Sequence, residues 1–594
     1  MRFAGNRCVV VGLVLAMGAG CQGQIRGAVE GDGPDGSGAI AANGGGGDGA
    51  GNGGGGAGGD GAAAGSGGGA GNGPVSCDDG LIAAGPSRLR RLQPDEYANT
   101  ARALLDDPSV EPHLEAQLGE IITAHEVETL SDAAGELAPG AAYEGYAPCD
   151  LEGALDATCA HGFIAAFGKA AFRRPLEADD ETWLIGVYEK LLAADVTPAF
   201  TFRETIDALA EVMLQAPQHV YLHERGVADG SLPDGLRKLT GYERATRLSY
   251  LMASSTPDAE LMAAADDGEL DTEAGVRAQA ERLLDAPAAH DMVRTFASSW
   301  LRLNDTPQHP SLEKLTKNGE KFPIDSDELR TAMRTESEHV YERAFFGDGP
   351  TFQTLLTGRD AYVDGPLAQL YGVSDGPTEA GDFQWVELPA DERAGIFTRA
   401  AFLTSFASAD YQSPVLRGVH MYRHVLCQPL PDPPANVDNT PPEPSDANTP
   451  KSVRQLFETK TSGDCQSCHA MVNPLGFAFE KYDALGQFQT IESGELEGEP
   501  FTVPVDSSAV LAAGDLQGEV ADAVELSQQL AESDMAHDCM VETWFERALS
   551  REPGDAEACG LAAIKDEFRE TSNLRELLLS LASSDSALFI EEAP

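Results

Sequence analysis

Basic residues are scarce in this chain. Its 594 residues include 41 Lys and Arg against 96 Asp and Glu, which gives a formal net charge of −55 at pH 7. Nucleic acids and anionic lipid surfaces are bound mainly through Lys and Arg side chains. The composition therefore argues against nucleic acid as a partner and leaves basic or neutral partners.

Long apolar runs and several familiar catalytic motifs are also missing. After the first 20 residues, no apolar stretch approaches the length of about 20 residues that spans a bilayer. The chain contains no Gly-x-Ser-x-Gly elbow, no His-Glu-x-x-His pair, no phosphate loop and no Gly-x-Gly-x-x-Gly after a strand. These absences argue against the hydrolase, metalloprotease, nucleotidase and dinucleotide-binding classes that use those motifs.

The first 20 residues carry the features of an export signal. Arg2 and Arg7 precede a short apolar run, residues 9–17, and small residues lead from there to Cys21. This order is typical of a secretory signal peptide. Because Cys21 directly follows Ala-Gly, the segment resembles a bacterial lipobox, and we expect cleavage after residue 20 and a lipid on Cys21. The alternative is an ordinary secreted protein cut near Gly20.

A low-complexity segment follows the signal. Residues 31–75 are almost wholly Gly, Ala, Asn, Asp and Ser, which lack the apolar surface of a core. We therefore predict a lipid anchor and disordered tether over residues 21–76. Removal of residues 1–20 takes away two positive charges, so the mature net charge is −55 − 2 = −57. The expected location is the cell envelope, outside the cytoplasm, with the lipid as the membrane contact.

Helical periodicity dominates the rest of the chain. Apolar residues recur at intervals of three and four at residues 97–105, 201–214, 243–252, 274–284 and 326–346. This spacing predicts amphipathic helices. Strand patterns are rare, and the best candidates are short stretches at 384–388 and 501–505. The predicted fold class is therefore mainly α with few short strands.

One pentapeptide, Cys465-Gln466-Ser467-Cys468-His469, carries specific chemistry. It reads Cys-x-x-Cys-His, the attachment signature of c-type haem, in which the two thiols add to the porphyrin and His469 becomes the proximal iron ligand. A zinc site would need two further ligands nearby, and a thioredoxin-like pair would need a βαβ context. A short-loop disulfide between Cys465 and Cys468 is the third alternative.

Several helical domains in series are expected after the tether, at residues 77–145, 146–225, 226–375, 376–490 and 491–594. The domain at 376–490 would be a small c-type haem domain. It also contains a proline-rich segment, residues 428–450, directly ahead of the haem motif. Its prolines exclude helix and favour an extended polyproline II strap.

Six further cysteines lie outside the signal peptide, the lipidation site and the motif: Cys77, Cys149, Cys159, Cys427, Cys539 and Cys559. An even number in an oxidising compartment predicts three disulfides, for which 15 connectivities are possible. Because short loops cost the least entropy to close, we expect Cys149–Cys159 and Cys539–Cys559. Cys77–Cys427 would then be the third pair.

Eight blocks of sequence occur in a specific order along the chain: Leu89–Leu105, Phe163–Glu181, Leu239–Leu270, Phe296–Leu303, Leu355–Gly372, Ser413–Gly418, Asp464–Phe488 and Trp544–Cys559. With them the chain resembles the exported, multi-domain cytochrome c-like proteins of the planctomycete and myxobacterial type, which are built from consecutive domains of unknown function. The resemblance implies a haem protein at a bacterial surface and names no substrate.

One covalent haem c and one-electron transfer to an unidentified redox protein are the leading expectation. The first alternative is a haem oxidoreductase with an open iron site, although di-haem peroxidases use a second Cys-x-x-Cys-His, which this chain lacks. The second alternative is a disulfide-stapled surface scaffold without haem.

The sixth iron ligand stays open at this point. Candidates are Met535, His537 and Met540 downstream of the motif and His420, Met421 and His424 upstream, whereas Met471 lies too close to His469. On the proximal side, the Pro474 carbonyl is expected to accept the imidazole N–H. Phe477, Phe479 and Tyr482 either wall the ring or belong to the ordinary core.

Overall fold

The structure is a computed structural model. It describes residues 82–592 apart from 88, 113, 115–122, 144, 195–198, 307–308, 348, 350, 432–439, 441 and 443–448. The predicted signal peptide, Cys21, the tether, Cys77 and most of the proline-rich segment lie outside the described residues, so those predictions stay predictions.

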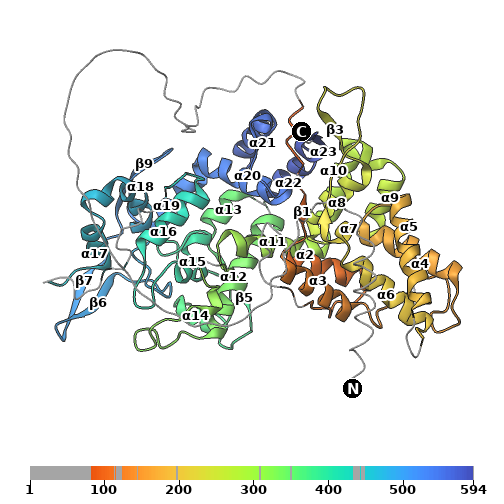
Figure 1. Ribbon diagram of the computed structural model, residues 1–594. Helices are drawn as coiled ribbons and strands as arrows, with labels where there is room; N and C mark the ends of the chain where they lie inside the picture. Colours follow the sequence, from red (N-terminus) through yellow and green to blue (C-terminus); the bar gives the residue numbers. More distant parts are fainter. Residues whose placement is uncertain are drawn as a thin grey trace, which may run out of the picture.

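Helices make up most of the described chain, which confirms the mainly α prediction (Figure 1). The α-helices are α2 (Pro94–Leu105), α3 (Ala124–Leu137), α4 (Ala157–Phe172), α5 (Ala178–Ala193), α6 (Phe202–Leu214), α7 (Pro217–Val220), α8 (Gly241–Ala253), α9 (Ala259–Asp266), α10 (Glu273–Leu284), α11 (Pro287–Trp300), α12 (Asp327–Phe346), α13 (Phe352–Thr357), α14 (Gly365–Leu370), α15 (Ala400–Ser405), α16 (Pro414–His420), α17 (Val453–Lys460), α18 (Gln466–Phe477), α19 (Ala523–Glu532), α20 (Asp534–Leu549), α21 (Ala558–Thr571), α22 (Leu574–Ala582) and α23 (Asp585–Leu588). A π-helical turn, η4 (Met421–Val425), continues α16, and a 3-10 turn, η6 (Gly463–Cys465), precedes α18.

The strands are short and pair two by two in antiparallel sheets. The pairs are β1 (Arg90–Arg91) with β2 (Tyr221–Leu222), β3 (Leu236–Lys238) with β10 (Phe589–Glu591), β4 (Asp360–Val363) with β5 (Gln384–Glu387), β6 (Ile491–Leu496) with β7 (Glu499–Pro504), and β8 (Ala509–Ala513) with β9 (Leu516–Val520). Within the described part of the chain, no helix combines the length and apolarity needed to cross a bilayer.

The five helices expected from periodicity are present as α2, α6, α8, α10 and α12, and the two strand candidates are β5 and β7. Their starts follow from capping chemistry. Thr272 precedes α10, and its hydroxyl accepts the N–H of Gly275 at 3.1 Å. Thr240 and Glu243 form a reciprocal capping box at α8. Each cap satisfies N–H groups that the first turn of a helix leaves unpaired.

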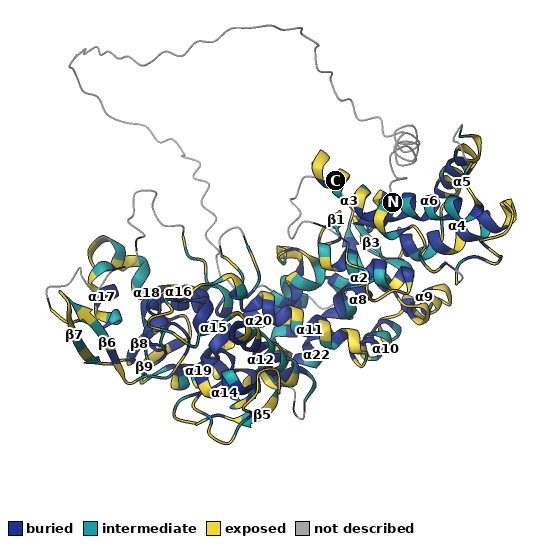
Figure 2. Ribbon diagram, turned by 90° about the horizontal axis from the view of Figure 1, so that it is seen from below, coloured by how far each residue is buried: buried dark blue, intermediate teal, exposed yellow. Residues whose placement is uncertain are grey.

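Two large apolar cores and one small apolar cluster lie along the elongated molecule (Figure 2). The smaller core runs from Leu104 to Ala216 and joins α4, α5 and α6 at one end. The larger core runs from Ala245 to Leu588 and includes α8, α11, α12, α15, α18 and α20. At its centre the ring of Trp544 stacks on that of Phe296, with centroids 3.7 Å apart. The Cys-x-x-Cys-His segment lies at the far end of this larger unit.

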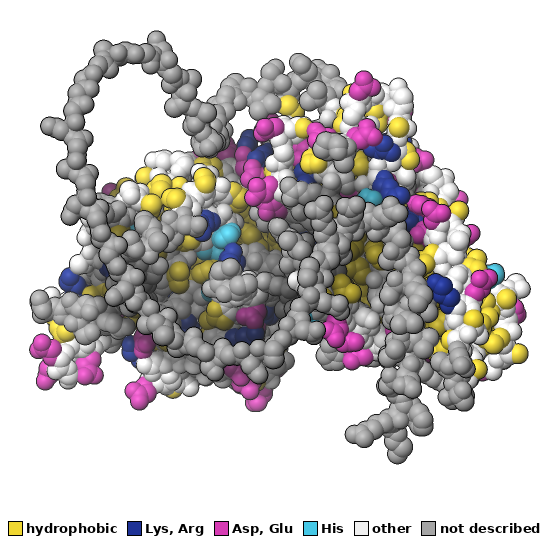
Figure 3. Space-filling view, in the orientation of Figure 1, with side chains coloured by type: hydrophobic (Ala, Val, Ile, Leu, Met, Phe, Trp, Pro, Cys, Tyr) yellow, Lys and Arg dark blue, Asp and Glu magenta, His cyan; other side chains and the backbone are white. Residues whose placement is uncertain are grey.

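Charge is distributed differently on the surface and in the interior. Figure 3 shows Asp and Glu side chains at several places along the visible face. Among the described residues, however, as many basic as acidic side chains are buried, although acids outnumber bases more than twofold in the whole chain. The negative charge therefore resides mainly in exposed side chains and leaves the interior near neutrality.

Two glycines set the crossing of α16 and α18. Gly418 lies against the Val472 carbonyl and Gly476 against the Pro414 carbonyl, and a Cβ atom at either position would overlap that oxygen. Neither glycine has a positive φ. The close approach of the two backbones, and not an unusual conformation, is therefore what requires glycine here.

The disulfides confirm one predicted pair and correct the other two. Cys149 and Cys159 are bonded, as expected. Cys427 is bonded to Cys539, with Cα atoms 5.2 Å apart, so the predicted Cys539–Cys559 and Cys77–Cys427 pairs are wrong. Cys559 is itself disulfide-bonded.

Tertiary packing explains the correction. The helix α20, which carries Cys539, packs against η4, and Cys427 follows η4 by two residues. Closing the long loop rather than the short one costs only on the order of 1–2 kcal/mol of extra chain entropy. That difference is small beside the packing energy that brings α20 to η4.

Replacement of Gly418 by Ala should destabilise the protein by about 3 kcal/mol, because the added methyl group overlaps the Val472 carbonyl. The matched control is Gly186→Ala in α5, where a Cβ would meet nothing within 4 Å. For this variant we expect the free energy of unfolding to rise by about 0.5–1 kcal/mol. Urea unfolding of the three proteins measures both effects. Equal midpoints would contradict the close crossing of α16 and α18.

Candidate functional site

The Cys-x-x-Cys-His segment forms the start of α18. Cys465 ends the 3-10 turn η6 and is the N-cap residue of α18, and Cys468 and His469 lie in the first turn of this helix. Residues three apart lie on one face of a helix. Both thiols are free and partly exposed, so the two cysteines are not joined as the short-loop disulfide alternative required.

A chain of hydrogen bonds fixes the His469 ring. Its Nδ1 is 3.0 Å from the side-chain oxygen of Asn473, one turn further along α18. The Asn473 amide nitrogen donates to Thr461 Oγ1 at 2.9 Å, and Thr461 donates to the Phe457 carbonyl at 2.7 Å. Asn473 is 7% and Thr461 9% exposed. The ring is therefore held from its Nδ1 side, and Nε2 is the nitrogen left for a ligand.

Asn473 takes the role that the sequence suggested for the Pro474 carbonyl. Pro474 lies inside α18, and its carbonyl faces the Ala478 N–H at 3.4 Å within the helix. The spacing of four residues between His469 and Asn473, which places the two side chains on one face of a helix, is the sequence signal for this contact.

The helix α17 holds Thr461 and the Phe457 carbonyl in place behind His469 and Asn473. Its last turn provides the Phe457 carbonyl and leads to Thr461. Its first N–H, that of Val453, donates to Glu492 Oε2 at 2.8 Å. The bond ties α17 to β6 and so places Thr461 against α18.

Two buried carboxyl groups, those of Glu480 and Glu492, lie close together beside the Val453–Glu492 hydrogen bond. Gln412 Nε2 is 3.2 Å from Glu480 Oε2 and 3.0 Å from Glu492 Oε1. Burial, together with the nearby charge of Glu492, raises the pKa of Glu480 to about 8. Burial also raises the pKa of Glu492. Glu480 is therefore largely protonated at neutral pH, and the pair carries less than two negative charges.

The aromatic residues after the motif belong to the core. Phe479 and Tyr482 are 0% and 1% exposed and lie in the larger apolar cluster. Phe477 is buried as well, and the Arg454 guanidinium covers its ring at 4.6 Å. The ordinary-core interpretation of these three side chains therefore describes them in the structure.

Three of the sixth-ligand candidates make hydrogen bonds to other groups. His537 uses both nitrogens, with Ser533 O and Ser572 Oγ each at 2.8 Å. Met540 accepts from a tyrosine hydroxyl at 3.6 Å, and Met535 accepts the Asp515 N–H at 3.3 Å. Met471, already set aside, accepts from the Tyr422 hydroxyl at 3.3 Å.

The upstream candidates lie on α16 and η4. Met421 is buried in the larger core. Burial and the charge of Arg302, whose Nη1 is 3.3 Å from His424 Nε2, lower the pKa of His424 to about 4. His420 is fully buried beside Phe406, at a centroid distance of 4.6 Å, and both its nitrogens lack a hydrogen-bond partner. Burial lowers the pKa of His420 well below its usual value, so the ring is neutral.

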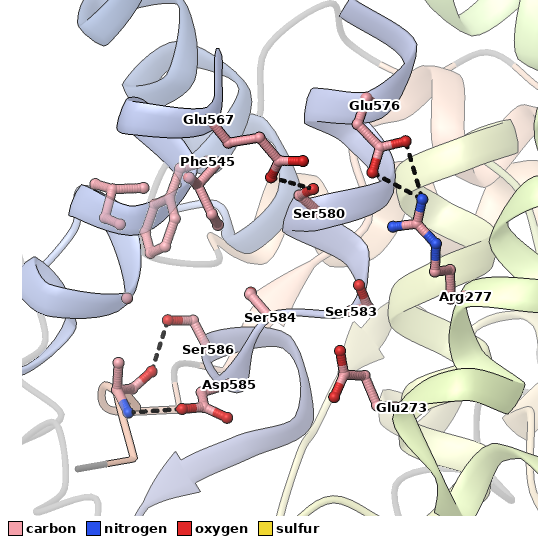
Figure 4. A pocket seen from close by; sticks show the side chains of 14 residues that line it. Glu273, Arg277, Phe545, Glu567, Glu576, Ser580, Ser583, Ser584, Asp585 and Ser586 are labelled. Atoms are coloured by element: carbon pink, nitrogen blue, oxygen red, sulfur yellow. Dashed lines mark hydrogen bonds and ion pairs between the residues drawn. The ribbon is translucent and has the colours of Figure 1, made fainter. Parts of the chain in front are cut away.

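A separate polar cavity of about 310 Å³ lies between α10, α21 and α22 (Figure 4). Arg277 Nη2 spans it to the two oxygens of Glu576 at 2.7 and 2.9 Å, and Ser580 donates to Glu567 at 3.1 Å. Its lining contains no His or Cys. Four of its polar side chains are thus engaged in pairs, and the lining contains no imidazole or thiol.

A metal cluster of the zinc type is not formed by the residues that the structure describes. None of their His, Cys, Asp and Glu side chains gather in groups of three or more suited to a metal ion. The motif is therefore a set of two thiols and one imidazole along a helix rather than a preformed cage.

Comparison with protein-family models gives four matches, each described as a protein of unknown function. They are DUF1595 at residues 159–224, DUF1592 at 239–373, DUF1588 at 393–492 and DUF1585 at 517–586. The four follow one another along the chain, which is the pattern found in cytochrome c-like proteins of the planctomycete type. The DUF1588 match contains Cys465, Cys468 and His469. No curated protein and no solved structure matches the chain.

The pH dependence of stability should report on Glu480. Its pKa in the folded protein, about 8, lies above its ordinary value of 4.5. Protonation of Glu480 therefore stabilises the folded state. This stabilisation is fully present below pH 4.5 and is lost as the pH rises through about 8. The contribution is on the order of a few kcal/mol. Melting temperatures of the wild type and Glu480→Gln across pH 5 to 9 should diverge, with the variant increasingly favoured at high pH.

The control for this comparison is Glu495→Gln on the exposed face of β6. It makes the same Glu-to-Gln change without touching a buried carboxyl group. Parallel melting curves for the wild type and Glu480→Gln would contradict the raised pKa.

Proposed function

We propose that this chain carries one c-type haem on Cys465 and Cys468, with His469 as the proximal iron ligand, and that it transfers single electrons outside the cytoplasm. One observation carries the proposal. Two free thiols three residues apart at a helix start are followed directly by an imidazole that is already oriented through Nδ1.

The residues present fit covalent attachment of a porphyrin. Each thiol can add across one vinyl group, with sulfur bonding one carbon and hydrogen the other, so no oxidant and no leaving group are required. Because both cysteines are free and partly exposed, they are accessible to this addition. The haem iron, when bound, supplies the one-electron redox couple.

The chain's own residues have distinct tasks in this proposal. His469 binds through Nε2, the nitrogen opposite the one that contacts Asn473. Asn473 orients the ring, and α17 and the Glu492–Val453 bond hold the support in place. The strongly negative chain favours a basic redox protein as partner, since opposite charge steers encounter. Lipidation at Cys21 would keep the protein at the cell envelope.

The test is a pyridine haemochrome spectrum of the full chain exported in a host with cytochrome c maturation machinery. The wild type should show a band typical of two thioether links and retain haem after denaturation. Cys468→Ala and Cys465→Ala should each show a shifted, weaker band, and the double variant should retain no covalent haem. Ser467→Ala, exposed between the two cysteines, is the matched control and should behave as the wild type.

A colourless wild type would overturn the proposal, whether its two thiols react with an alkylating reagent or mass spectrometry finds them bridged, and would leave the disulfide-stapled scaffold. If haem is present, rapid CO binding by the reduced protein would instead favour the oxidoreductase alternative with an open iron site. Absence of CO binding agrees with electron transfer.

A further inference from the structure

The hydrogen bonds behind His469 allow the position of each proton to be worked out. Thr461 has a single hydroxyl proton, and it lies toward the Phe457 carbonyl. Its oxygen must therefore accept from Asn473, which places the amide nitrogen of Asn473 on that side. The amide oxygen then faces His469 Nδ1 at 3.0 Å, and an oxygen can only accept. His469 Nδ1 is consequently the protonated nitrogen.

From this geometry we infer that Asn473, held by Thr461, is a positioning residue that keeps His469 in the Nδ1–H tautomer, with an unprotonated Nε2, before any ligand arrives. The redox consequence of this inference rests on the proposed function, whereas the tautomer itself does not. The group that accepts the Nδ1 proton is a side-chain amide. The neighbouring Pro474 carbonyl is directed along the helix toward the Ala478 N–H instead.

Burial restricts the Asn473 amide to one orientation. Asn473 and Thr461 are almost fully enclosed, so water cannot readily replace a missing partner, and a buried polar group left unpaired costs about 1–3 kcal/mol. The amide of Asn473 therefore keeps one orientation. Without the Thr461 hydroxyl that orientation is no longer imposed, and a flipped amide would donate to Nδ1 and move the proton to Nε2.

A neutral amide also sets how strongly the ring donates to a metal. Groups that accept the second N–H of a ligating imidazole tune its basicity and orientation. Asn473→Asp would place a carboxylate at the same distance and draw the Nδ1 proton more strongly, which makes Nε2 a better donor and stabilises oxidised iron. Asn473→Leu removes the acceptor and has the opposite effect.

The first test reads the tautomer without haem. In the full chain with Cys465→Ala and Cys468→Ala, long-range ¹H–¹⁵N spectra at a pH where histidine is neutral should show His469 as Nδ1–H. The His469 signals are assigned by their loss in His469→Gln, and His161, exposed on α4, is the internal reference. Asn473→Leu and Thr461→Val should shift the His469 signals toward Nε2–H. Thr461→Ser, which keeps the hydroxyl group, should show the same signals as the parent chain.

The second test uses the haem-loaded chain and measures its reduction potential. Asn473→Asp should lower the potential and Asn473→Leu should raise it, while Ser467→Ala leaves it unchanged. A purely structural role would not produce shifts of opposite sign in two variants of similar size.

These tests separate the two proposals. A wild type that takes up no haem contradicts the proposed function, yet the tautomer spectra still decide the role of Asn473. An Nε2–H signal for His469 in the otherwise unchanged chain, or a pattern that Asn473→Leu leaves unaltered, would overturn the inference. Loss of folding in Thr461→Val is recognised by far-UV circular dichroism, and Thr461→Ser then provides the decisive comparison.

Discussion

The Arg417 guanidinium holds together the part of the molecule on which the site depends. It is fully buried and donates to four backbone carbonyls, those of Leu403, Phe479, Tyr482 and Asp483. These carbonyls belong to the end of α15 and to the loop after α18, so one side chain joins the two segments. Burial lowers the pKa of Arg417 to about 10, so it stays charged at neutral pH. One planar cation thus cross-links two segments through several carbonyl oxygens.

The same solution recurs elsewhere in the interior. Arg173 donates to the carbonyls of Gln218, His219 and Tyr221. Lys317 donates to three carbonyls around the end of α15. A buried charge is costly unless it is paired or fully hydrogen-bonded. Carbonyl groups supply hydrogen bonds to these buried groups, and burial lowers the pKa of Lys317 to about 7, so that amine is only partly charged at neutral pH.

This rigid frame has a direct bearing on the motif. Arg417 precedes Gly418, so one short segment both ties down the loop after α18 and lets the two helices touch. The start of α18, with Cys465 and Cys468, stays partly exposed. The body of the helix is therefore fixed, while its first turn is partly exposed. Asn473 lies at the boundary between the fixed and the open part.

Much of the molecule follows from sequence patterns alone. Apolar spacing and capping residues specify α2, α6, α8, α10 and α12 because helix formation is governed by neighbours within four residues. The Cys-x-x-Cys-His motif is equally local, since all its residues lie within one pentapeptide. The Cys149–Cys159 bond, within a short loop, belongs to the same class.

Other features depend on contacts between distant segments and only the tertiary structure decided them. Cys427 pairs with Cys539 because α20 packs on η4, and the modest entropy of loop closure could not outweigh that packing. The orientation of His469 depends on Thr461 as well as Asn473, and the two belong to different helical segments. Local periodicity carries no information about which side chain from another segment completes a buried hydrogen bond, because that choice is made by packing across the whole core.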